Sequence, residues 1–553
     1  MDSRLQTGAE AVLRVLRAQG VERIFASPGS DWAPLWEALA RPYAAGEVPE
    51  YISSRHEETA VGMATGYFKA TGKLPALVLH TTVGALHATM GLRAALHERI
   101  PMVVLAGESI SFAEAPAPPA GRQWLRVLTD LGGPARLVEP AVKWSFGLNS
   151  SLILPHTMQR ACQLAMSAPR GPVFVSVPTE HLMETMSAEP PAVAALPASP
   201  GADPAALSQV AAALNAAKKP LIVTEELGRS IGAVGQLVRL ADALGAPVLD
   251  GWHADYVNFP RDHPLYAGIA VEPLNDLLKE ADFVLLAEAV APWHPPSALR
   301  DTKVATLGED PLHRHLPFWG FRADYVLPGD AEQSLARLAD QVKPRKPWRS
   351  VSAQLPAVSE GQKITAAWIG QELNEVLPHD AIVVNETISH RGDLMRRQLR
   401  LAPGSFFEAS YGGLGMGLGT ALGVKNAQPH RPVVLTIGDG SFYYNPVVAA
   451  FGACQELALP LLIVLFDNAG YFSQKNDVVR EYPDGWAVRT NRFIGTSITP
   501  CPDYAMLARA FGGHGERVEK PSDVRAALGR GLEAVAQGRL ALIHMVLEPV
   551  NRP

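Results

Sequence analysis

The sequence is poor in cysteine, with 3 such residues among 553. Cys162, Cys454 and Cys501 lie far apart and form no CxxC pair. This spacing excludes a disulfide scaffold and a cysteine-ligated zinc cluster. We therefore expect buried, inert thiols in a reducing compartment.

The sequence also lacks a basic excess and long apolar runs. Its 49 Lys and Arg residues face 55 Asp and Glu residues, so the net charge is −6 at pH 7. A nucleic-acid footprint is usually a basic excess, which disfavours DNA and RNA as partners. No stretch reaches the ~18 uncharged apolar residues of a membrane span. Charged residues at Glu10, Arg14 and Arg17 interrupt the N-terminal segment where a signal peptide needs an apolar core. We expect a cytoplasmic protein with no membrane partner.

Short apolar runs recur along the chain, which is 47% hydrophobic. Examples are residues 76–79, 173–177, 283–287 and 433–437. Uniform runs, as opposed to alternating ones, are typical of parallel strands buried on both faces. Helix-like segments such as 234–244 lie between them. This alternation predicts α/β units with right-handed crossovers.

Two stretches rich in Pro, Ala and Ser, 188–204 and 343–362, interrupt that rhythm. Their composition is typical of linkers. They divide the chain into expected domains at 1–187, 205–342 and 363–553, each large enough for one open sheet. The predicted fold class is α/β, with three doubly wound parallel-sheet domains.

The most informative stretch is an apolar run that ends in Gly438-Asp439-Gly440. A second run, 461–466, is followed by Asp467-Asn468-Ala469-Gly470, so that Asn468 lies 29 positions after Asp439. That separation fits one strand-helix-strand unit. Because the carboxyl ends of parallel strands face one crevice, we expect the two side chains to meet there. The glycines beside Asp439 leave backbone N–H groups accessible to an anion such as a phosphate.

An Asp carboxylate, an Asn side-chain carbonyl and a backbone carbonyl are hard oxygen ligands. Such ligands beside a diphosphate suit octahedral Mg²⁺. Zinc is disfavoured because no Cys or His stands with them in the sequence. Gly-Asp-Gly alone is a common turn. The second strand ending in Asn-x-Gly is what favours a functional site.

These two motifs resemble the thiamine-diphosphate motif of the superfamily that includes acetolactate synthase, pyruvate decarboxylase and benzoylformate decarboxylase. The resemblance implies a metal held by Asp439, Asn468 and the Gly470 carbonyl, and cofactor contacts at Gly440 and Ser441. The sequence departs from the family at Asp467, where an Asn is often found, and its spacing is slightly longer than is common.

A glycine-rich stretch upstream, 410–419, fits no GxGxxG register, so the dinucleotide fingerprint fails there. Its simplest interpretation is a helix entry packed against a sheet. By the family resemblance, the Gly412 carbonyl accepts from the aminopyrimidine of the cofactor, and Leu414 is an apolar wedge beneath it. The segment after the predicted strand 382–384 looks like the family's diphosphate-side loop. Its expected cofactor contacts are Asn385, Glu386 and Ser389.

The first domain contains a run from His56 to Tyr67 that invites comparison with the HExxH zinc motif. Position 60 is Ala, so the second zinc ligand is missing. A plain helix start would also place Glu57 favourably at the positive end of the helix dipole. The run resembles the HExxAxxMAxGYA helix of the thiamine family, which implies that Glu57 donates to the pyrimidine ring and supports acid-base chemistry through the cofactor. Glu57 then needs an apolar pocket to hold a proton at neutral pH.

Two further segments agree with this family. Residues 25–30 look like the FGNPG turn that opens the substrate side, and Ser30 is a candidate contact for a substrate carboxylate. His80 looks like the strand-end histidine that is catalytic in benzoylformate decarboxylase-type members, which makes it a candidate proton relay. A strand-end histidine is otherwise usually structural. Weaker candidates for the pocket wall are Tyr471, Phe472 and His294.

A competing motif, Gly228-Arg229-Ser230-Ile231-Gly232, fits the GxSxG pattern of serine hydrolases. Two polar residues, Glu225 and Glu226, separate the preceding strand from Ser230, whereas a nucleophile elbow requires the serine at the strand's end. The simpler interpretation is a helix N-cap. A serine hydrolase is therefore a remote alternative.

The expected function is non-oxidative decarboxylation of a 2-oxo acid, either benzoylformate- or phenylpyruvate-like or pyruvate-like, through an enamine released as an aldehyde. The implied cofactors are thiamine diphosphate and Mg²⁺. The alternative is an acetolactate synthase-like carboligase that joins the enamine to a second carbonyl. Because Glu57 and the metal motif lie in different domains, the resemblance implies sites between the subunits of a homodimer or homotetramer. The sequence leaves open whether a flavin or nucleotide binds the middle domain.

Overall fold

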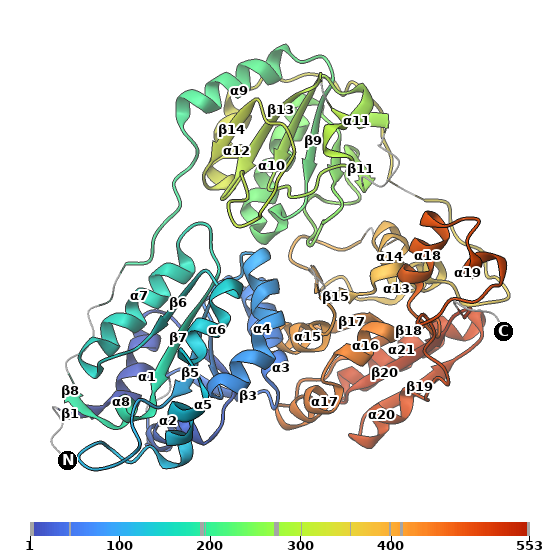
Figure 1. Ribbon diagram of the computed structural model, residues 1–553. Coiled ribbons are helices and arrows are strands. Elements are labelled where there is room, and N and C mark those ends of the chain that lie inside the picture. The colour runs from blue at the N-terminus through green and yellow to red at the C-terminus, as the bar shows by residue number, and fades with distance from the viewer. Residues whose placement is uncertain are drawn as a thin grey trace. The chain divides into compact units, whose positions relative to one another are not determined.

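The computed structural model describes residues 5–43, 46–188, 193, 195–269, 276–299, 301–353, 355–397, 400–409 and 413–549 (Figure 1). Over these residues the backbone forms three six-stranded sheets and one two-stranded sheet. The chain divides into two compact units. Unit 1 consists of Met1–Ala198, Ser410–Pro429 and Tyr443–Leu459, and unit 2 of Ser199–Ala409, His430–Phe442 and Pro460–Pro553.

The large sheet of unit 1 has the strand order β3-β2-β4-β5-β7-β6, and its described pairings are parallel. The strands are β2 (Arg23–Ser27), β3 (Glu50–Ser53), β4 (Ala76–Leu79), β5 (Met102–Glu108), β6 (Trp144–Gly147) and β7 (Pro172–Pro178). The chain leaves β2 for β3 on one side and returns to β4 on the other. The topological switch, where such sheets bind ligands, therefore lies between β2 and β4.

Helices cover both faces of this sheet. The first is α1 (Gly8–Ala18), which begins with a capping box between Thr7 and Glu10. The others before the linker are α2 (Ala33–Leu39), α3 (Glu57–Thr71), α4 (Thr81–His97), α5 (Arg126–Thr129), α6 (Gly133–Val138), α7 (Leu154–Met166) and α8 (Thr179–Met183). α1 packs with α7, and α3 packs with α4. A short antiparallel pair, β1 (Leu5–Thr7) with β8 (Thr185–Ser187), completes this part.

Two later helices, α15 (Gly417–Ala427) and α17 (Val447–Glu456), also belong to unit 1. Glycines let α15 approach α3 at backbone distance. A Cβ on Gly66 would lie 2.0 Å from the Thr420 carbonyl oxygen, and a Cβ on Gly423 would lie 2.0 Å from the Met63 carbonyl oxygen. The glycine-rich stretch thus leads into a helix that packs on a helix, where we had expected a sheet.

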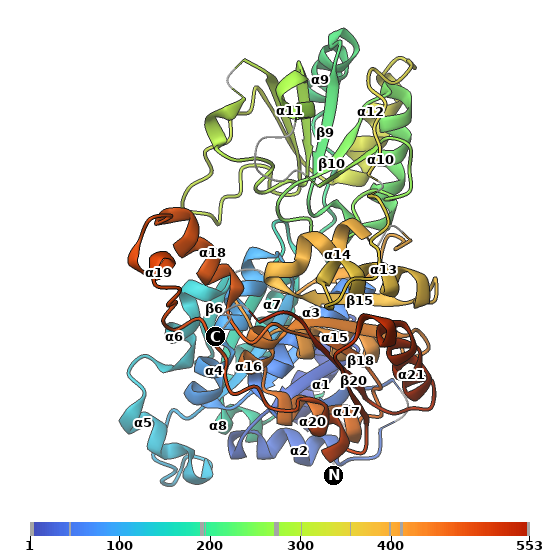
Figure 2. The same ribbon diagram turned by 90° about the vertical axis from the view of Figure 1, so that its right-hand side faces the viewer.

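The middle sheet, in unit 2, has the order β11-β10-β9-β12-β13-β14. Its strands are β9 (Pro220–Thr224), β10 (Val248–Asp250), β11 (Tyr266–Ile269), β12 (Phe283–Ala287), β13 (Lys303–Gly308) and β14 (Tyr325–Pro328). Its helices are α9 (Pro204–Ala216), α10 (Ile231–Leu244), α11 (Asp276–Glu280) and α12 (Ala331–Gln341). Figure 2 shows α10 and α12 on one face and α11 on the other, each face with its own apolar core.

The third sheet, also in unit 2, has the order β16-β15-β17-β18-β20-β19. Its strands are β15 (Ile382–Glu386), β16 (Phe406–Glu408), β17 (Val433–Gly438), β18 (Leu462–Asp467), β19 (His514–Val518) and β20 (Ala541–Val546). Its helices include α13 (Ala366–Val376), α14 (Arg391–Arg397), α16 (Asp439–Tyr444), α18 (Phe472–Glu481), α19 (Trp486–Arg489), α20 (Ala505–Ala510) and α21 (Val524–Ala536). Here the switch lies between β15 and β17.

The predicted α/β class with three doubly wound parallel sheets is confirmed. The predicted apolar runs at 76–79, 283–287 and 433–437 all lie in buried strands. The exact domain limits stay a prediction. Among the described helices, none combines the length and apolar character needed to cross a bilayer.

Candidate active site

Glu57 is the first residue of α3, and His56 caps that helix. The His56 imidazole accepts the Glu58 backbone N–H through Nδ1 at 3.1 Å, which satisfies one of the N–H groups that a helix start leaves open. The Glu57 side chain is half-buried at the positive end of the helix dipole. Next to it, burial raises the pKa of the Glu58 carboxyl to about 7.

His80 follows β4 directly and precedes α4. It therefore stands at the switch between β2 and β4, where a ligand crevice is expected. His80 and Glu57 both approach Gly84, because a Cβ added there would lie 3.4 Å from the His80 Cβ and 3.5 Å from the Glu57 Cγ. The structure brings these two predicted catalytic residues together within unit 1.

Asp31, which the sequence reasoning missed, lies against His80. The Asp31 Oδ1 atom is 2.6 Å from His80 Nδ1, and Oδ2 accepts the Thr81 backbone N–H at 3.1 Å. The Asp31 side chain is fully buried, whereas that of His80 is 24% exposed. The available signal was an acid directly after the strand-end turn 25–30. Its partner lies 49 positions away, which no local pattern reveals.

Ser30 comes from the same turn as Asp31 and is exposed. Its hydroxyl accepts a hydrogen bond from the Gln123 amide at 2.8 Å. It also lines a cavity of about 440 Å³, together with Thr7, Ala33, Pro34, Glu37, Ala38, Arg41, Pro119, Ala120, Gly121, Thr179, Leu182 and Met183. Contact between Ser30 and a substrate carboxylate stays a prediction.

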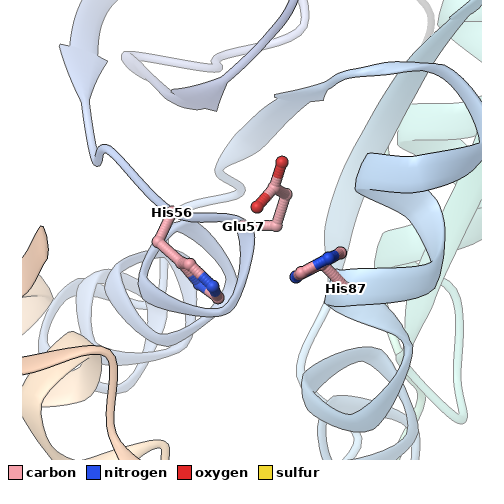
Figure 3. A group of neighbouring side chains, drawn as sticks. All are labelled: His56, Glu57 and His87. Atoms are coloured by element: carbon pink, nitrogen blue, oxygen red, sulfur yellow. The ribbon is translucent and has the colours of Figure 1, made fainter.

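His56, Glu57 and His87 face one another, with ligand-type atoms all within 4.8 Å (Figure 3). A His₂Glu set is one that zinc enzymes use. Here, however, the Nδ1 lone pair of His56 already accepts the Glu58 N–H, so the proton of the neutral imidazole is on Nε2. A metal bound at Nδ1 would displace the Glu58 N–H and remove the helix cap. A metal bound at Nε2 would require the tautomer that carries its proton on Nδ1. We therefore do not assign this cluster to a metal.

The predicted metal ligands come together in unit 2. Asp439 follows β17, and Asn468 follows the neighbouring parallel strand β18. The Asp439 carboxylate accepts the backbone N–H groups of Gly440 at 2.8 Å and Gly470 at 3.0 Å. Between the two motif residues, Ala469 has a left-handed φ of 57°, a strained conformation that places Gly470 beside Asp439.

Two side chains outside the predicted set hold this loop. His544, which is fully buried, lies 2.7 Å through Nε2 from Asp467 Oδ2. His390 Nε2 lies 3.3 Å from the Asn468 amide nitrogen, and burial lowers the pKa of His390, so its neutral ring can accept from that amide. Asp467, which stands where the family often has an Asn, is thus paired with His544.

Three family models match the chain in sequence order. They are the N-terminal TPP binding domain of thiamine pyrophosphate enzymes at residues 6–119, the central domain at 207–338 and the C-terminal TPP binding domain at 390–545. The chain belongs to the thiamine pyrophosphate enzymes. Thiamine pyrophosphate is thiamine diphosphate, so the resemblance read from Asp439 and Asn468 is confirmed.

Relatives of this thiamine pyrophosphate enzyme include both decarboxylases and synthases. It is 26% identical to benzoylformate decarboxylase of Pseudomonas aeruginosa, over 99% of this chain and 100% of that one. It is 29% identical to the acetolactate synthase isozyme 2 large subunit of Escherichia coli, over 94% and 92%. The solved thiamine diphosphate-dependent 4-hydroxybenzoylformate decarboxylase of Rhodococcus jostii RHA1 superposes with a TM-score of 0.85 at 25% identity, over 98% and 99%.

The residues around Asp439 fit a divalent cation in this thiamine pyrophosphate enzyme. Burial and the neighbouring Asp467 carboxylate raise the pKa of Asp439. Although burial opposes it, hydrogen bonds from His544 and the Ala469 amide lower the pKa of Asp467. Two neighbouring carboxyl groups, of which Asp467 opposes the ionisation of Asp439, and an Asn carbonyl beside them offer the hard oxygen donors that such a cation prefers.

The residues predicted to contact the cofactor or line the pocket differ in how deeply they are buried. Gly440 and Ser441 are buried at the start of α16, and a Cβ on Gly440 would lie 2.8 Å from the Tyr471 ring, so a side chain there would have to displace that ring. Tyr471 and Phe472 are half-buried. Leu414 is half-buried in unit 1, and Gly412 lies outside the described residues. His294 is exposed after β12.

Asn385 and Glu386 end β15, at the switch of the third sheet, and both are buried. The Asn385 side chain is already engaged in the chain's own hydrogen bonds. Its partners are Thr387 at 2.7 Å, Thr436 at 2.8 Å and Glu408 at 2.9 Å. Asn385 therefore ties three strands together at the crevice, and Ser389 is exposed beyond it.

The middle sheet has the strand order that in dinucleotide-binding folds carries a phosphate at its first strand-to-helix turn. In this chain Glu225 occupies that turn. Its fully buried carboxylate accepts the backbone N–H groups of His253 at 2.8 Å, Ala291 at 2.7 Å and Val290. The amides that follow β10 and β12 therefore already donate to the chain's own carboxyl group.

Ser230 acts as a helix cap. At the start of α10, the Ser230 hydroxyl accepts a hydrogen bond from the Ala233 N–H at 3.2 Å and donates one to the Glu332 carboxylate at 3.1 Å. The partners of the hydroxyl are thus an amide and a carboxylate, and no histidine is among them in the described part of the chain. The serine hydrolase alternative is not favoured, and the simpler interpretation stands.

Proposed function

We propose that this chain is a thiamine diphosphate-dependent decarboxylase that converts a 2-oxo acid to an aldehyde and carbon dioxide. The observation that carries the proposal is the group at the β2/β4 switch. There His80 is bound to buried Asp31 and lies beside Glu57. Release of an aldehyde needs a proton delivered to the carbon that has lost carbon dioxide, and His80 is a side chain suited to that transfer.

When bound, the cofactor supplies a nucleophilic carbon that adds to the 2-oxo group and takes up the electrons left by carbon dioxide. Glu57 would face the pyrimidine ring and hold a proton on it. Its place as the first residue of α3, half-buried and beside His80, supports this role.

His80 would exchange protons with the substrate at Nε2. Asp31 occupies Nδ1, so the second ring nitrogen is the one left for chemistry. Ser30, from the turn that also supplies Asp31, would bind the substrate carboxylate. Ser30 and Asp31 come after β2 and His80 directly follows β4, so all three lie at the β2/β4 switch of unit 1.

Asp439, Asn468 and the Gly470 carbonyl would hold Mg²⁺, which neutralises the diphosphate of the cofactor. The chain has a small negative net charge, so the anionic groups must be bound by local devices. The backbone N–H groups of the buried α16 start, at Gly440 and Ser441, are of that kind.

Binding and turnover test the proposal separately. Apo-protein titrated with thiamine diphosphate and Mg²⁺ should show saturable binding, and the loaded enzyme should release aldehyde from at least one of benzoylformate, phenylpyruvate, pyruvate and a branched-chain 2-oxo acid. Glu57→Gln should keep cofactor binding and lose most turnover. Exposed Glu50→Gln is the matched control and should keep both. Full turnover in Glu57→Gln would refute the role of Glu57.

A further inference from the structure

We propose that Asp31 is the positioning residue of His80: it fixes the tautomer and the direction of the imidazole, so that Nε2 is the proton-exchanging atom. This inference rests on the proposed function, because His80 must take part in the reaction. The pair itself is a direct contact of 2.6 Å between Asp31 Oδ1 and His80 Nδ1.

Asp31 is fixed more firmly than a surface acid could be. It lies in the turn η1 (Ser30–Trp32) and its side chain is fully buried. Its second oxygen accepts the Thr81 N–H at 3.1 Å, so both oxygens bind groups at the end of β4. The adjacent Trp32 indole donates to the Leu79 carbonyl at 2.8 Å, which ties the same turn to the same strand end.

The backbone around the pair is shaped to admit it. A Cβ on Gly29 would lie 2.1 Å from His80 Nδ1, and a Cβ on Gly107 would lie 1.9 Å from Asp31 Oδ2. Neither distance is compatible with any side chain, so the imidazole and the carboxylate each lie directly on a glycine. Two glycines on neighbouring elements thus leave room for this particular contact.

The chemistry of the contact fixes the tautomer. An ionised carboxylate only accepts hydrogen bonds, so the His80 Nδ1 atom must carry a proton. In the neutral ring the lone pair is then on Nε2, on the opposite side from Asp31. In the serine protease triad, an Asp-to-Asn change that leaves the geometry intact selects the wrong histidine tautomer and severely lowers turnover.

The test compares Asp31→Asn with Glu50→Gln, the same chemical change at an exposed position on β3. An Asn amide at position 31 can donate to Nδ1, which would move the ring proton to Nε2. We expect kcat to fall by at least about 100-fold in Asp31→Asn, with thiamine diphosphate affinity unchanged within a factor of about two, and no change in Glu50→Gln. Equal kcat in wild type and Asp31→Asn would overturn the proposal.

Two readouts separate positioning from a purely structural role. In ¹⁵N-histidine spectra assigned with His80→Asn, wild-type His80 should carry its proton on Nδ1; an Nε2–H tautomer there would overturn the proposal without any Asp31 variant. In a His80→Ala background, adding Asp31→Asn should lower kcat no further, and a further fall would assign Asp31 a structural role. If no 2-oxo acid is turned over, the proposed function fails. The His80 tautomer in the ¹⁵N spectrum still tests whether Asp31 positions His80.

Discussion

Gly66→Ala should destabilise unit 1 strongly, although alanine is the better helix former. The new Cβ would lie 2.0 Å from the Thr420 carbonyl oxygen and 2.8 Å from the Val424 nitrogen. Both atoms belong to the backbone of α15, so no side chain can rotate away, and the helices must separate by more than about 1 Å in a close-packed interior. Overpacking of this kind costs about 3 kcal/mol.

The helix-propensity gain of about 1 kcal/mol offsets only part of that cost. We expect the thermal unfolding midpoint of the apo-protein to fall by roughly 4–8 °C at a fixed scan rate. Gly235→Ala is the matched control, because Gly235 lies inside α10 with nothing within 4 Å of the new Cβ. That variant should unfold at the same or a higher temperature. Equal thermal unfolding midpoints for Gly66→Ala and Gly235→Ala would refute the argument that α3 and α15 are in backbone contact at Gly66.

Three further predictions concern pH, assembly and the middle sheet. Burial raises the pKa of Glu58 to about 7 from 4.5, so its stabilising contribution is complete below pH 4.5 and is lost as pH rises through 7. Glu58→Gln should therefore show a smaller drop in melting temperature between pH 5 and pH 8 than wild type, and an equal drop would contradict this. Co-expressed Glu57→Gln and Asp439→Asn chains should regain about a quarter of wild-type activity if sites are shared between two copies, and no activity would argue for sites within one chain. Enzyme loaded with thiamine diphosphate should bind no ADP by equilibrium dialysis, because the amides that follow β10 and β12 already donate to Glu225; saturable binding would contradict this prediction.

The fold class could be predicted from the sequence because parallel strands buried on both faces leave a local signature. The runs at 283–287 and 433–437 are uniformly apolar, and each forms a buried strand. The approach of Asp439 to the Asn468–Gly470 turn could also be predicted, since Asp439 and Asn468 directly follow neighbouring strands of one sheet. In these places the decisive contacts are set by sequence spacing and by the regular geometry of a βαβ unit.

Other features depend on tertiary contacts that leave no local signature. Asp31 meets a strand end 49 positions away, and Gly66 meets a helix that begins at Gly417. Glu225 served in the sequence reasoning as a spacer before Ser230, yet its carboxylate binds amides from two other strand ends. Asn385, expected to contact the cofactor, is bonded within the chain, and its predicted cofactor contact stays untested. The residue types indicated that these positions are polar sites, but the hydrogen-bond partners of each side chain are set by the tertiary fold.

The most direct test of the central claim is the ratio of 2-oxo acid consumed to carbon dioxide released by the loaded wild-type enzyme. A decarboxylase in which His80 delivers the proton should consume one molecule of 2-oxo acid for each carbon dioxide and form one aldehyde. His80→Ala should lower aldehyde release. Consumption of two molecules per carbon dioxide, with an acyloin-type product and no aldehyde, would contradict the account.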